Sequence, residues 1–253
     1  MAESFGADAE RYDRARPGYP VALVERIVAA SPGPDVLDVG CGTGIAGRQF
    51  QAAGCRVLGV DPDARMADLA RRSGLDVEVA TFETWDRAGR EFDVVIAGQA
   101  WHWVDPVAGA AKAAQVLRPG GRLAVFWNAF EPPPDLGAEF AGVYRDVQPD
   151  FPFNPWARPD PDAYLALCGK AADGIRQVGE FGGPEEWRFG WNRRYSRDEW
   201  LEMVPTCGGH SQIPPAALQE LLAGIGAAID AVGGSFTMRY TTVAVTAARR
   251  SAP

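Results

Sequence analysis

The stretch Val36-Leu37-Asp38-Val39-Gly40-Cys41-Gly42-Thr43-Gly44 joins a short apolar run to a loop with three alternating glycines. The apolar run predicts a buried β-strand, and the residues after the loop predict a helix. Glycines in such a turn adopt backbone angles that other residues avoid, and they place no Cβ atom in the way of a ligand. The stretch therefore predicts a nucleotide-binding loop at the carboxyl end of a strand.

Strand and helix patterns alternate on both sides of this loop. Because parallel strands are joined by crossover helices, the alternation predicts a parallel sheet. An opening helix is expected at 20–30, strands at 36–39, 57–60, 77–80, 92–97 and 122–127, and crossover helices at 44–53, 64–73 and 107–117.

The pattern changes after residue 127, where prolines and aromatic residues become frequent. Helices are expected at 135–147 and 161–171, strands at 187–195 and 235–247, and two more helical stretches between these strands at 197–204 and 214–232. We expect the last two strands to pair with each other.

Together these elements predict an α/β fold. We expect a Rossmann-like sheet of seven strands, mostly parallel with an antiparallel last strand, helices on both faces and a helical cap insertion. The predicted domains are a cofactor-binding core with an N-terminal helical arm (1–127), a helical cap over the substrate (128–186), and strands and helices that complete the sheet (187–253).

Composition excludes several classes of function. Apolar residues make up 47% and charged residues 23% of the 253 residues, as in an ordinary globular protein. The net charge of -8 argues against a nucleic-acid partner, which needs clustered Lys and Arg. The most basic stretch, at 188–197, is typical of an edge strand with solvated charges.

Cysteine usage and hydropathy bear on location. The four cysteines have no paired spacing and the chain has two histidines, so no zinc-ligand set is expected. Reduced thiols predict a cytoplasmic protein. The N-terminus lacks an apolar signal core and no stretch approaches about 20 apolar residues, so neither secretion nor membrane insertion is expected.

The glycine loop by itself admits more than one cofactor. Gly42-x-Gly44-x-x-Gly47 matches the dinucleotide fingerprint, and Asp61 lies near the spacing of about 20 residues that this fingerprint expects. Counted from Gly40, however, the third glycine position holds Ile45, so the close approach of helix to strand is not supplied. A nicotinamide-dependent oxidoreductase is therefore an alternative that this register disfavours.

The pattern Asp38-x-Gly40-x-Gly42-x-Gly44 resembles motif I of the class I S-adenosylmethionine-dependent methyltransferases. Further motifs of that family follow in order to residue 127, including Leu117-Arg118-Pro119-Gly120-Gly121 before the fifth strand. The resemblance implies that Asp38 meets the ammonium of the cofactor, and that Asp61 accepts hydrogen bonds from both ribose hydroxyls.

The resemblance extends to the rest of the cofactor site. Thr81 stands where many relatives have an Asp for the adenine amino group, and the backbone N–H of Phe82 remains available to the ring. The segment from Tyr12 to Pro20 resembles an arm of the trans-aconitate methyltransferase-like group that folds over the cofactor, although a loosely packed arm is an alternative. The implied cofactor contacts are Tyr12, Arg16, Asp38, Gly40, Gly42, Gly44, Asp61, Pro62, Met66, Thr81, Phe82 and Gln99.

The run Gly98-Gln99-Ala100-Trp101-His102-Trp103 follows the fourth strand, at the edge where such sheets bind ligands. Aromatic side chains attract a cationic sulfonium, and a histidine takes a proton from a hydroxyl nucleophile. We expect His102 to be catalytic, and Trp101, Trp103, Trp127 and Trp156 to contact substrate. The alternative is that alternate residues of this run point into the core.

The resulting prediction is a methyltransferase that acts on a small molecule, at a hydroxyl or carboxylate oxygen, without a metal. A non-catalytic S-adenosylmethionine-binding protein is a second alternative. The expected partner is the small-molecule substrate, and neither a nucleic acid nor a membrane is expected as a partner. The chain is expected to be a monomer or a homodimer. His210, in a Gly-Gly-His-Ser loop, is expected at the surface.

Overall fold

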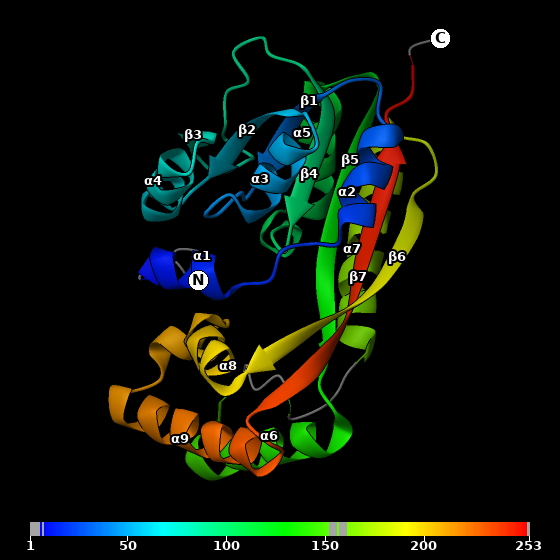
Figure 1. Ribbon diagram of the computed structural model, residues 1–253. Helices are drawn as coiled ribbons and strands as arrows, with labels where there is room; N and C mark the ends of the chain where they lie inside the picture. The colour runs from blue at the N-terminus through cyan, green and yellow to red at the C-terminus, as the bar shows by residue number, and fades with distance from the viewer. Residues whose placement is uncertain (1–5, 7, 152–155, 157–160, 252–253) are drawn as a thin grey trace.

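The computed structural model describes residues 6, 8–151, 156 and 161–251, and its centre is a seven-stranded sheet (Figure 1). The strand order is β3-β2-β1-β4-β5-β7-β6. Strand β7 is antiparallel to both of its neighbours, and the remaining pairs are parallel. The mostly parallel sheet with an antiparallel last strand is therefore confirmed. The strands are β1 (Asp35–Val39), β2 (Arg56–Asp61), β3 (Asp76–Val79), β4 (Phe92–Gly98), β5 (Leu117–Glu131), β6 (Glu185–Ser196) and β7 (Ser235–Ala248).

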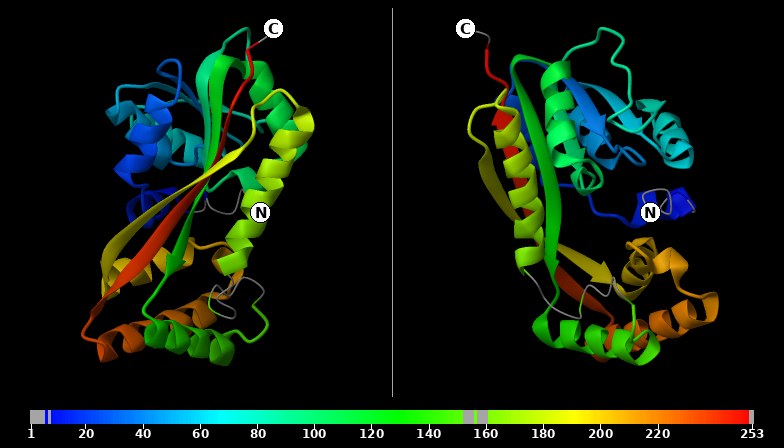
Figure 2. Two further views of the ribbon diagram at one scale, coloured as in Figure 1. Left: turned by 90° about the vertical axis from the view of Figure 1, so that its right-hand side faces the viewer. Right: turned by 180° about the vertical axis from the view of Figure 1, so that it is seen from behind.

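Helices cover both faces of the sheet (Figure 2). One face packs against α2 (Val21–Ala29), α3 (Ile45–Ala52) and α4 (Ala64–Arg72), and the other against α5 (Pro106–Val116) and α7 (Pro161–Val178). Successive strand residues point to opposite faces, so in β1 Val36 joins the first core and Leu37 the second. Burial on both faces explains why these strands are apolar without alternation.

Side chains at the helix starts hold several of these elements in place. Asp63 accepts a hydrogen bond from the backbone N–H of Arg65 at the start of α4, and Asp105 accepts two at the start of α5. In the helix α8 (Arg197–Met203), Ser196 and Glu199 form a capping box. These caps satisfy backbone N–H groups that have no partner within the helix.

A second group of helices, which we call the cap, packs around the far ends of β5, β6 and β7 (Figures 1 and 2). Its core is aromatic. The Phe140 ring stacks on Trp200 with centroids 6.1 Å apart and meets Phe236 edge-on at 6.0 Å. The cap consists of α6 (Pro134–Val147), α8, η3 (Val204–Thr206), η4 (His210–Gln212) and α9 (Pro215–Ala231).

The cap is built from segments that are distant in the sequence. Helix α6 lies between β5 and β6, whereas α8 and α9 lie between β6 and β7. Helix α7 packs beside α5 against the sheet and contributes Cys168, Ala171 and Ile175 to the core there. The domain limits at 127/128 and 186/187 stay predictions, and packing rather than chain order defines the cap.

His210 lies inside the cap, so the expected surface position is wrong. Its side chain is 1% exposed, and its Nε2 atom lies 2.5 Å from the Tyr144 hydroxyl. Its ring also meets Phe151 edge-on, with centroids 5.0 Å apart. The glycines and serine around it suggested a solvated loop, but the aromatic side chains of α6 and the following turn cover this loop.

Helix α1 (Ala9–Ala15) lies between the sheet core and the cap (Figure 1). Asp8 caps it by accepting a hydrogen bond from the backbone N–H of Arg11. Ala15 is buried with the residues of the cap core. The sequence predicts an arm here, and the described part of that arm is a packed helix.

Within the described ranges, no helix combines the length and apolar character needed to cross a lipid bilayer.

Candidate active site

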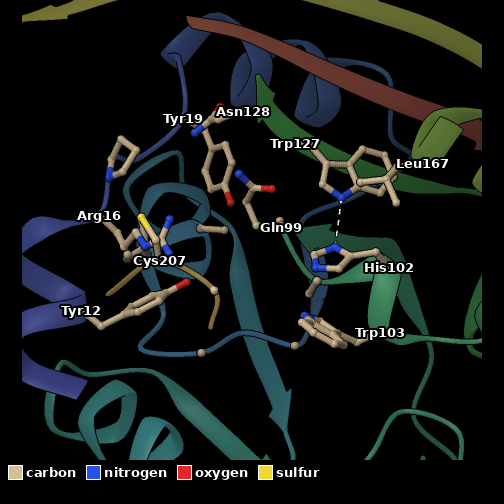
Figure 3. Close-up of a pocket in the computed structure, with 18 of the residues that line it drawn as sticks. Tyr12, Arg16, Tyr19, Gln99, His102, Trp103, Trp127, Asn128, Leu167 and Cys207 are labelled. Carbon is tan, nitrogen blue, oxygen red and sulfur yellow. Dashed lines mark hydrogen bonds between the residues drawn. The ribbon is translucent and has the colours of Figure 1, made fainter. Parts of the chain in front are cut away.

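A cavity of about 980 Å3 lies at the carboxyl ends of β1, β2, β3 and β4 and continues between the sheet core and the cap (Figure 3). Ligands of open α/β sheets bind at this edge. Fifteen of the predicted site residues line this cavity: Tyr12, Arg16, Asp38, Gly40, Gly42, Asp61, Pro62, Met66, Thr81, Phe82, Gln99, His102, Trp103, Trp127 and Trp156.

The glycine loop has the backbone geometry that the motif predicts. Gly40 and Gly42 have φ values of +65° and +55°, in the left-handed region that favours glycine. A Cβ atom on Gly40 would lie 2.5 Å from the Cβ of Ala100, so only glycine fits between β1 and β4. The loop therefore places bare backbone along the cavity wall.

Asp38 is a buried carboxylate with an unused acceptor. Its side chain is 1% exposed, and within the described chain its Oδ2 atom has no hydrogen-bond partner. Burial, with a smaller contribution from the charge of Asp61, raises the pKa of Asp38 to about 8, while the Gly47 backbone N–H acts in the opposite direction. Such a group favours a cationic partner from the cavity.

Asp61, at the end of β2, organises the loop. Its Oδ2 atom accepts a hydrogen bond from the backbone N–H of Gly42, and its Oδ1 atom accepts one from Asp63, each at 2.8 Å. Burial is the main cause that raises the pKa of Asp61. Each carboxylate oxygen has a second lone pair, so both can still accept a hydroxyl hydrogen.

Beyond the glycine loop, the cavity is lined by Met66 and by the segment that contains Thr81 and Phe82. Met66 is 4% exposed, and its Cε atom would lie 3.5 Å from a Cβ placed on Gly42. The Phe82 side chain is buried in the core, while its segment still lines the cavity. The Thr81 hydroxyl pairs with that of Thr84 at 2.8 Å, in an exposed position.

Arg16 brings a buried cation to the cavity. Its Nη2 atom donates to the carbonyl of Thr206 at 2.5 Å, and its guanidinium lies 5.1 Å from the centre of the Tyr12 ring. Its Nε atom is buried without a partner within the described ranges. Burial acts to lower the pKa of Arg16, the surroundings with Cys207 foremost act to raise it, and within the described residues its guanidinium forms no ion pair. A buried cation in such surroundings favours an anionic ligand.

His102 faces the cavity between two tryptophans. The Trp127 indole N–H donates to His102 Nδ1 at 3.3 Å, and the Trp103 ring lies 4.8 Å from the His102 ring at 43° (Figure 3). Desolvation lowers the pKa of His102 below the ordinary value of a histidine.

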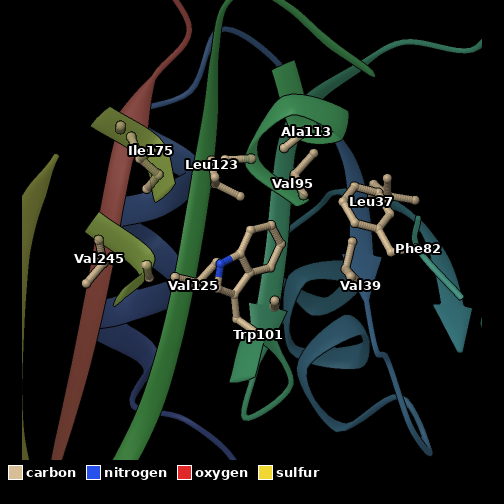
Figure 4. Close-up of a cluster of buried hydrophobic side chains, with 14 of the residues drawn as sticks. Leu37, Val39, Phe82, Val95, Trp101, Ala113, Leu123, Val125, Ile175 and Val245 are labelled. Carbon is tan, nitrogen blue, oxygen red and sulfur yellow. The ribbon is translucent and has the colours of Figure 1, made fainter. Parts of the chain in front are cut away.

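Trp101 does not line the cavity, and its predicted contact with substrate is wrong. Its side chain is 2% exposed and lies in the core on the α5 side of the sheet, with its ring 6.2 Å from Phe82 (Figure 4). Residues Trp101–Trp103 form the 3-10 helix η2. Because such a helix has three residues per turn, successive side chains point in different directions, and the first one here points into the core.

Gly44 also lies outside the cavity lining. It precedes α3 with a φ of +87°, and a Cβ there would meet Leu75 and Ala70 at 3.3 and 3.4 Å. It faces the packing between α3 and α4, so its predicted cofactor contact is not supported. Its role is to turn the chain into the helix.

Several cavity residues were absent from the predicted site. Tyr19 packs edge-on against Phe126, with ring centroids 4.6 Å apart, and Asn128 donates to the carbonyl of Gly18 at 3.1 Å. Tyr19 belongs to the arm motif and Asn128 directly follows a predicted strand, so both had a sequence signal. Leu167 and Cys207 had none, because their approach depends on how α7 and the cap pack.

Residues 37–125 match the model of the methyltransferase domain family. The methyltransferase domain is therefore assigned to this segment. S-adenosylmethionine is the cofactor of such domains, and this match favours it over the nicotinamide alternative. In the described residues no group of histidines, cysteines and carboxylates is placed to bind a metal.

Relatives of the methyltransferase domain agree with the match. An uncharacterized methyltransferase of Mycobacterium tuberculosis is 39% identical over 131 residues, which cover 51% of this chain and 53% of the relative. The malonyl-[acyl-carrier protein] O-methyltransferase of Hahella chejuensis is 35% identical over 133 residues, which cover 49% and 47%. The chain thus spans about half the length of the curated relatives it matches.

The fold is shared over more of the chain. The solved structure of a putative type II methyltransferase from Anaeromyxobacter dehalogenans superimposes with a TM-score of 0.65 at 25% identity, and covers 93% of this chain and 97% of its own. The similarity therefore includes the cap as well as the methyltransferase domain.

The side chains of the cavity fit S-adenosylmethionine. The unused Asp38 oxygen suits an ammonium, and the unpartnered Arg16 Nε suits a carboxylate, so an acceptor and a donor are both present for an amino-acid group. The glycine loop removes the Cβ atoms that would occupy the same space.

Proposed function

We propose that the chain is an S-adenosylmethionine-dependent methyltransferase that transfers a methyl group to an oxygen of a small molecule, either a hydroxyl or a carboxylate. The observation that carries this proposal is that the glycine loop borders the same cavity as Trp103, Trp127, Phe130 and Trp156, which we call the aromatic chamber. Its volume of about 980 Å3 is at the upper end of the range for small-molecule pockets, so it has room for cofactor and acceptor together.

In this proposal three groups of residues bind the cofactor. Asp38 and Arg16 hold the two charges of the amino-acid tail, with Tyr12 beside Arg16. Asp61 accepts the ribose hydroxyls. The residues proposed to enclose the adenine and the loop side of the cofactor are Gly40, Gly42, Pro62, Met66, Thr81, Phe82 and Gln99.

The acceptor half lies between the sheet and the cap. Bound S-adenosylmethionine supplies a methyl group on a cationic sulfur. Aromatic walls suit that charge and exclude water, which favours transfer in a displacement that removes charge. We place the acceptor beside Trp103 and Trp127, with Phe130 and Trp156 beyond them, their ring centroids 5.6 Å apart.

An oxygen acceptor is supported by two points. His102 lies on the cavity wall, where it can contact an oxygen of the substrate. Two relatives are named as O-methyltransferases, and their similarity covers 49% and 38% of this chain.

Two measurements test the proposal. Calorimetry is expected to show binding of S-adenosylhomocysteine and none of NAD. Transfer of a labelled methyl group is then measured against a panel of small carboxylic acids, phenols and alcohols. Transfer to at least one oxygen acceptor is expected. Binding without any transfer would favour the non-catalytic alternative, and binding of NAD alone would contradict the proposal.

Two glycine variants form a matched pair for these assays. Gly42 and Gly54 both have positive φ values, but Gly42 lines the cavity, whereas a Cβ on Gly54 meets nothing within 4 Å. Gly42→Val and Gly54→Val therefore carry similar backbone strain. Only Gly42→Val is expected to lose binding of S-adenosylhomocysteine, because its side chain occupies cofactor space.

A further inference from the structure

The indole of Trp127 is a fixed donor beside the proposed catalytic histidine. Trp127 lies within β5, with its side chain 1% exposed, and its backbone pairs with Val243 of β7. Its Nε1–H group donates to His102 Nδ1 at 3.3 Å. Because an indole N–H can donate but cannot accept, this contact assigns the acceptor role to Nδ1.

The protonation state of His102 follows from this contact. Desolvation lowers the pKa of His102, so the ring is neutral near pH 7 and carries one proton. With Nδ1 accepting from Trp127, that proton is on Nε2. In Figure 3 the second ring nitrogen of His102 faces the open part of the cavity, on the side of Gln99.

We propose that Trp127 is a positioning residue, which holds His102 in the tautomer whose Nε2–H donates a hydrogen bond to the methyl acceptor. This inference rests on the proposed function and replaces the expected role of His102 as a base. A base on the cavity side would need a bare Nε2 and a proton on Nδ1, which would face the Trp127 N–H.

Because His102 donates a hydrogen bond and does not act as a base, it restricts the kind of oxygen that can be methylated. Methylation of an ionised oxygen forms one C–O bond as the S–C bond breaks, the sulfur keeps that electron pair, and no proton is released. A hydroxyl that must lose its proton during transfer needs a base that His102 does not supply in this tautomer. The geometry therefore favours an acceptor oxygen that is already ionised at neutral pH, as carboxylates are.

The other histidine provides an internal reference. His210 Nδ1 lies 3.2 Å from the Gly208 carbonyl, which can only accept, so this nitrogen carries the proton. Its Nε2 then accepts from the Tyr144 hydroxyl. The two histidines of the chain are thus expected in opposite tautomers.

Nitrogen-15 NMR of the imidazole rings tests the tautomer without any turnover. The chain has two histidines, so His102→Gln assigns both sets of signals. We expect a protonated Nε2 and a bare Nδ1 for His102, and the reverse for His210, both in free protein and with S-adenosylhomocysteine. A protonated Nδ1 in His102 would overturn the inference and leave the proposed methyl transfer intact.

Trp127→Phe removes the donor and keeps an aromatic ring. The His102 Nδ1 signal is expected to move, and a share of the ring is expected to change tautomer. Trp187→Phe is the matched control, since Trp187 donates its indole N–H to Glu185 outside the cavity, and it should leave the His102 signals unchanged. An unchanged Nδ1 signal in Trp127→Phe would also overturn the proposal.

Kinetics of two His102 variants separate a donor from a base. Gln retains an N–H donor, whereas Leu has none. With an acceptor found in the panel, His102→Gln should keep most of kcat/KM, and His102→Leu should lose about tenfold or more, as expected for one hydrogen bond to a charged group. Equal losses in both variants would contradict the donor role.

Discussion

At the scale of single residues, Asp38 is both buried and proposed to bind the cofactor. Its burial makes the stability of the fold fall as the pH rises, whereas its binding role makes cofactor affinity increase. Its pKa of about 8 in the folded chain exceeds its ordinary value of 3.8, so the native state binds this proton more tightly than the unfolded state. The stability it contributes is present at low pH and is lost as the pH rises toward 8. Asp38→Asn should therefore melt at a higher temperature than wild type, with a difference that grows between pH 5 and 8.

The same residue governs affinity in the other direction. An ammonium binds the ionised carboxylate, so wild-type affinity for S-adenosylhomocysteine should rise between pH 6 and 8. Asp38→Asn should lose about tenfold or more in affinity and much of this pH dependence. Calorimetry across this range measures both, and an unchanged affinity in the variant would contradict the assignment of Asp38.

Arg16 is the residue proposed to bind the carboxylate of the same amino-acid tail. Because its buried guanidinium forms no ion pair within the described residues, its removal should cost little stability and much affinity. Arg16→Met is expected to weaken binding of S-adenosylhomocysteine about tenfold or more. Arg11→Met is the control, as Arg11 forms an exposed ion pair with Asp8 at 3.4 Å and should leave the affinity unchanged.

At the scale of elements, α1 is attached to both halves of the molecule. Arg48 donates to Asp13 of α1 and to the Thr43 carbonyl of the glycine loop, each at 2.7 Å. Arg14 of α1 pairs with Glu202 of α8 at 2.7 Å, with the side chains 59% and 38% exposed. The first contact is half-buried and joins the helix to the cofactor loop, whereas the second is solvated.

Arg48→Met should therefore loosen α1 more than Arg14→Met does. Hydrogen exchange of the α1 amides is expected to increase in Arg48→Met, and affinity for S-adenosylhomocysteine to fall several-fold. Arg14→Met should change stability by no more than about 1 kcal/mol, as for other surface ion pairs. If the two variants exchange at equal rates, α1 is not held through the glycine loop.

Some elements could be predicted from local sequence patterns, whereas others depend on how distant segments pack. The parallel strands and the glycine loop were predictable, because burial on both faces and left-handed turns restrict residue choice locally. The ends of β5 were not, since Pro119 and Gly120 resemble a turn, yet the Gly120 N–H donates to the carbonyl of Arg249, directly after β7. The inward side chain of Trp101 and the burial of His210 depend on packing that no local pattern records.

At the scale of the whole molecule, the sheet core and the cap share their strands. Strand β5 pairs with β7 from Arg122 opposite Ala248 to Glu131 opposite Arg239, so the ladder continues from the core into the cap. The cavity between them is bordered by both parts. A ladder shared in this way couples their unfolding, so we expect a single cooperative thermal transition.

Bound S-adenosylhomocysteine should raise the temperature of that transition for the core and the cap together. At 100 times its Kd, S-adenosylhomocysteine adds about 2.7 kcal/mol, which corresponds to a shift of about 5–10 °C for a chain of this size. Scanning calorimetry should show the shift in wild type and Gly54→Val and its absence in Gly42→Val. Two separate transitions, or a shift confined to one of them, would mean that the core binds the cofactor without the cap. In that case the aromatic chamber would not belong to the same site, and the cavity could no longer support the proposed transfer.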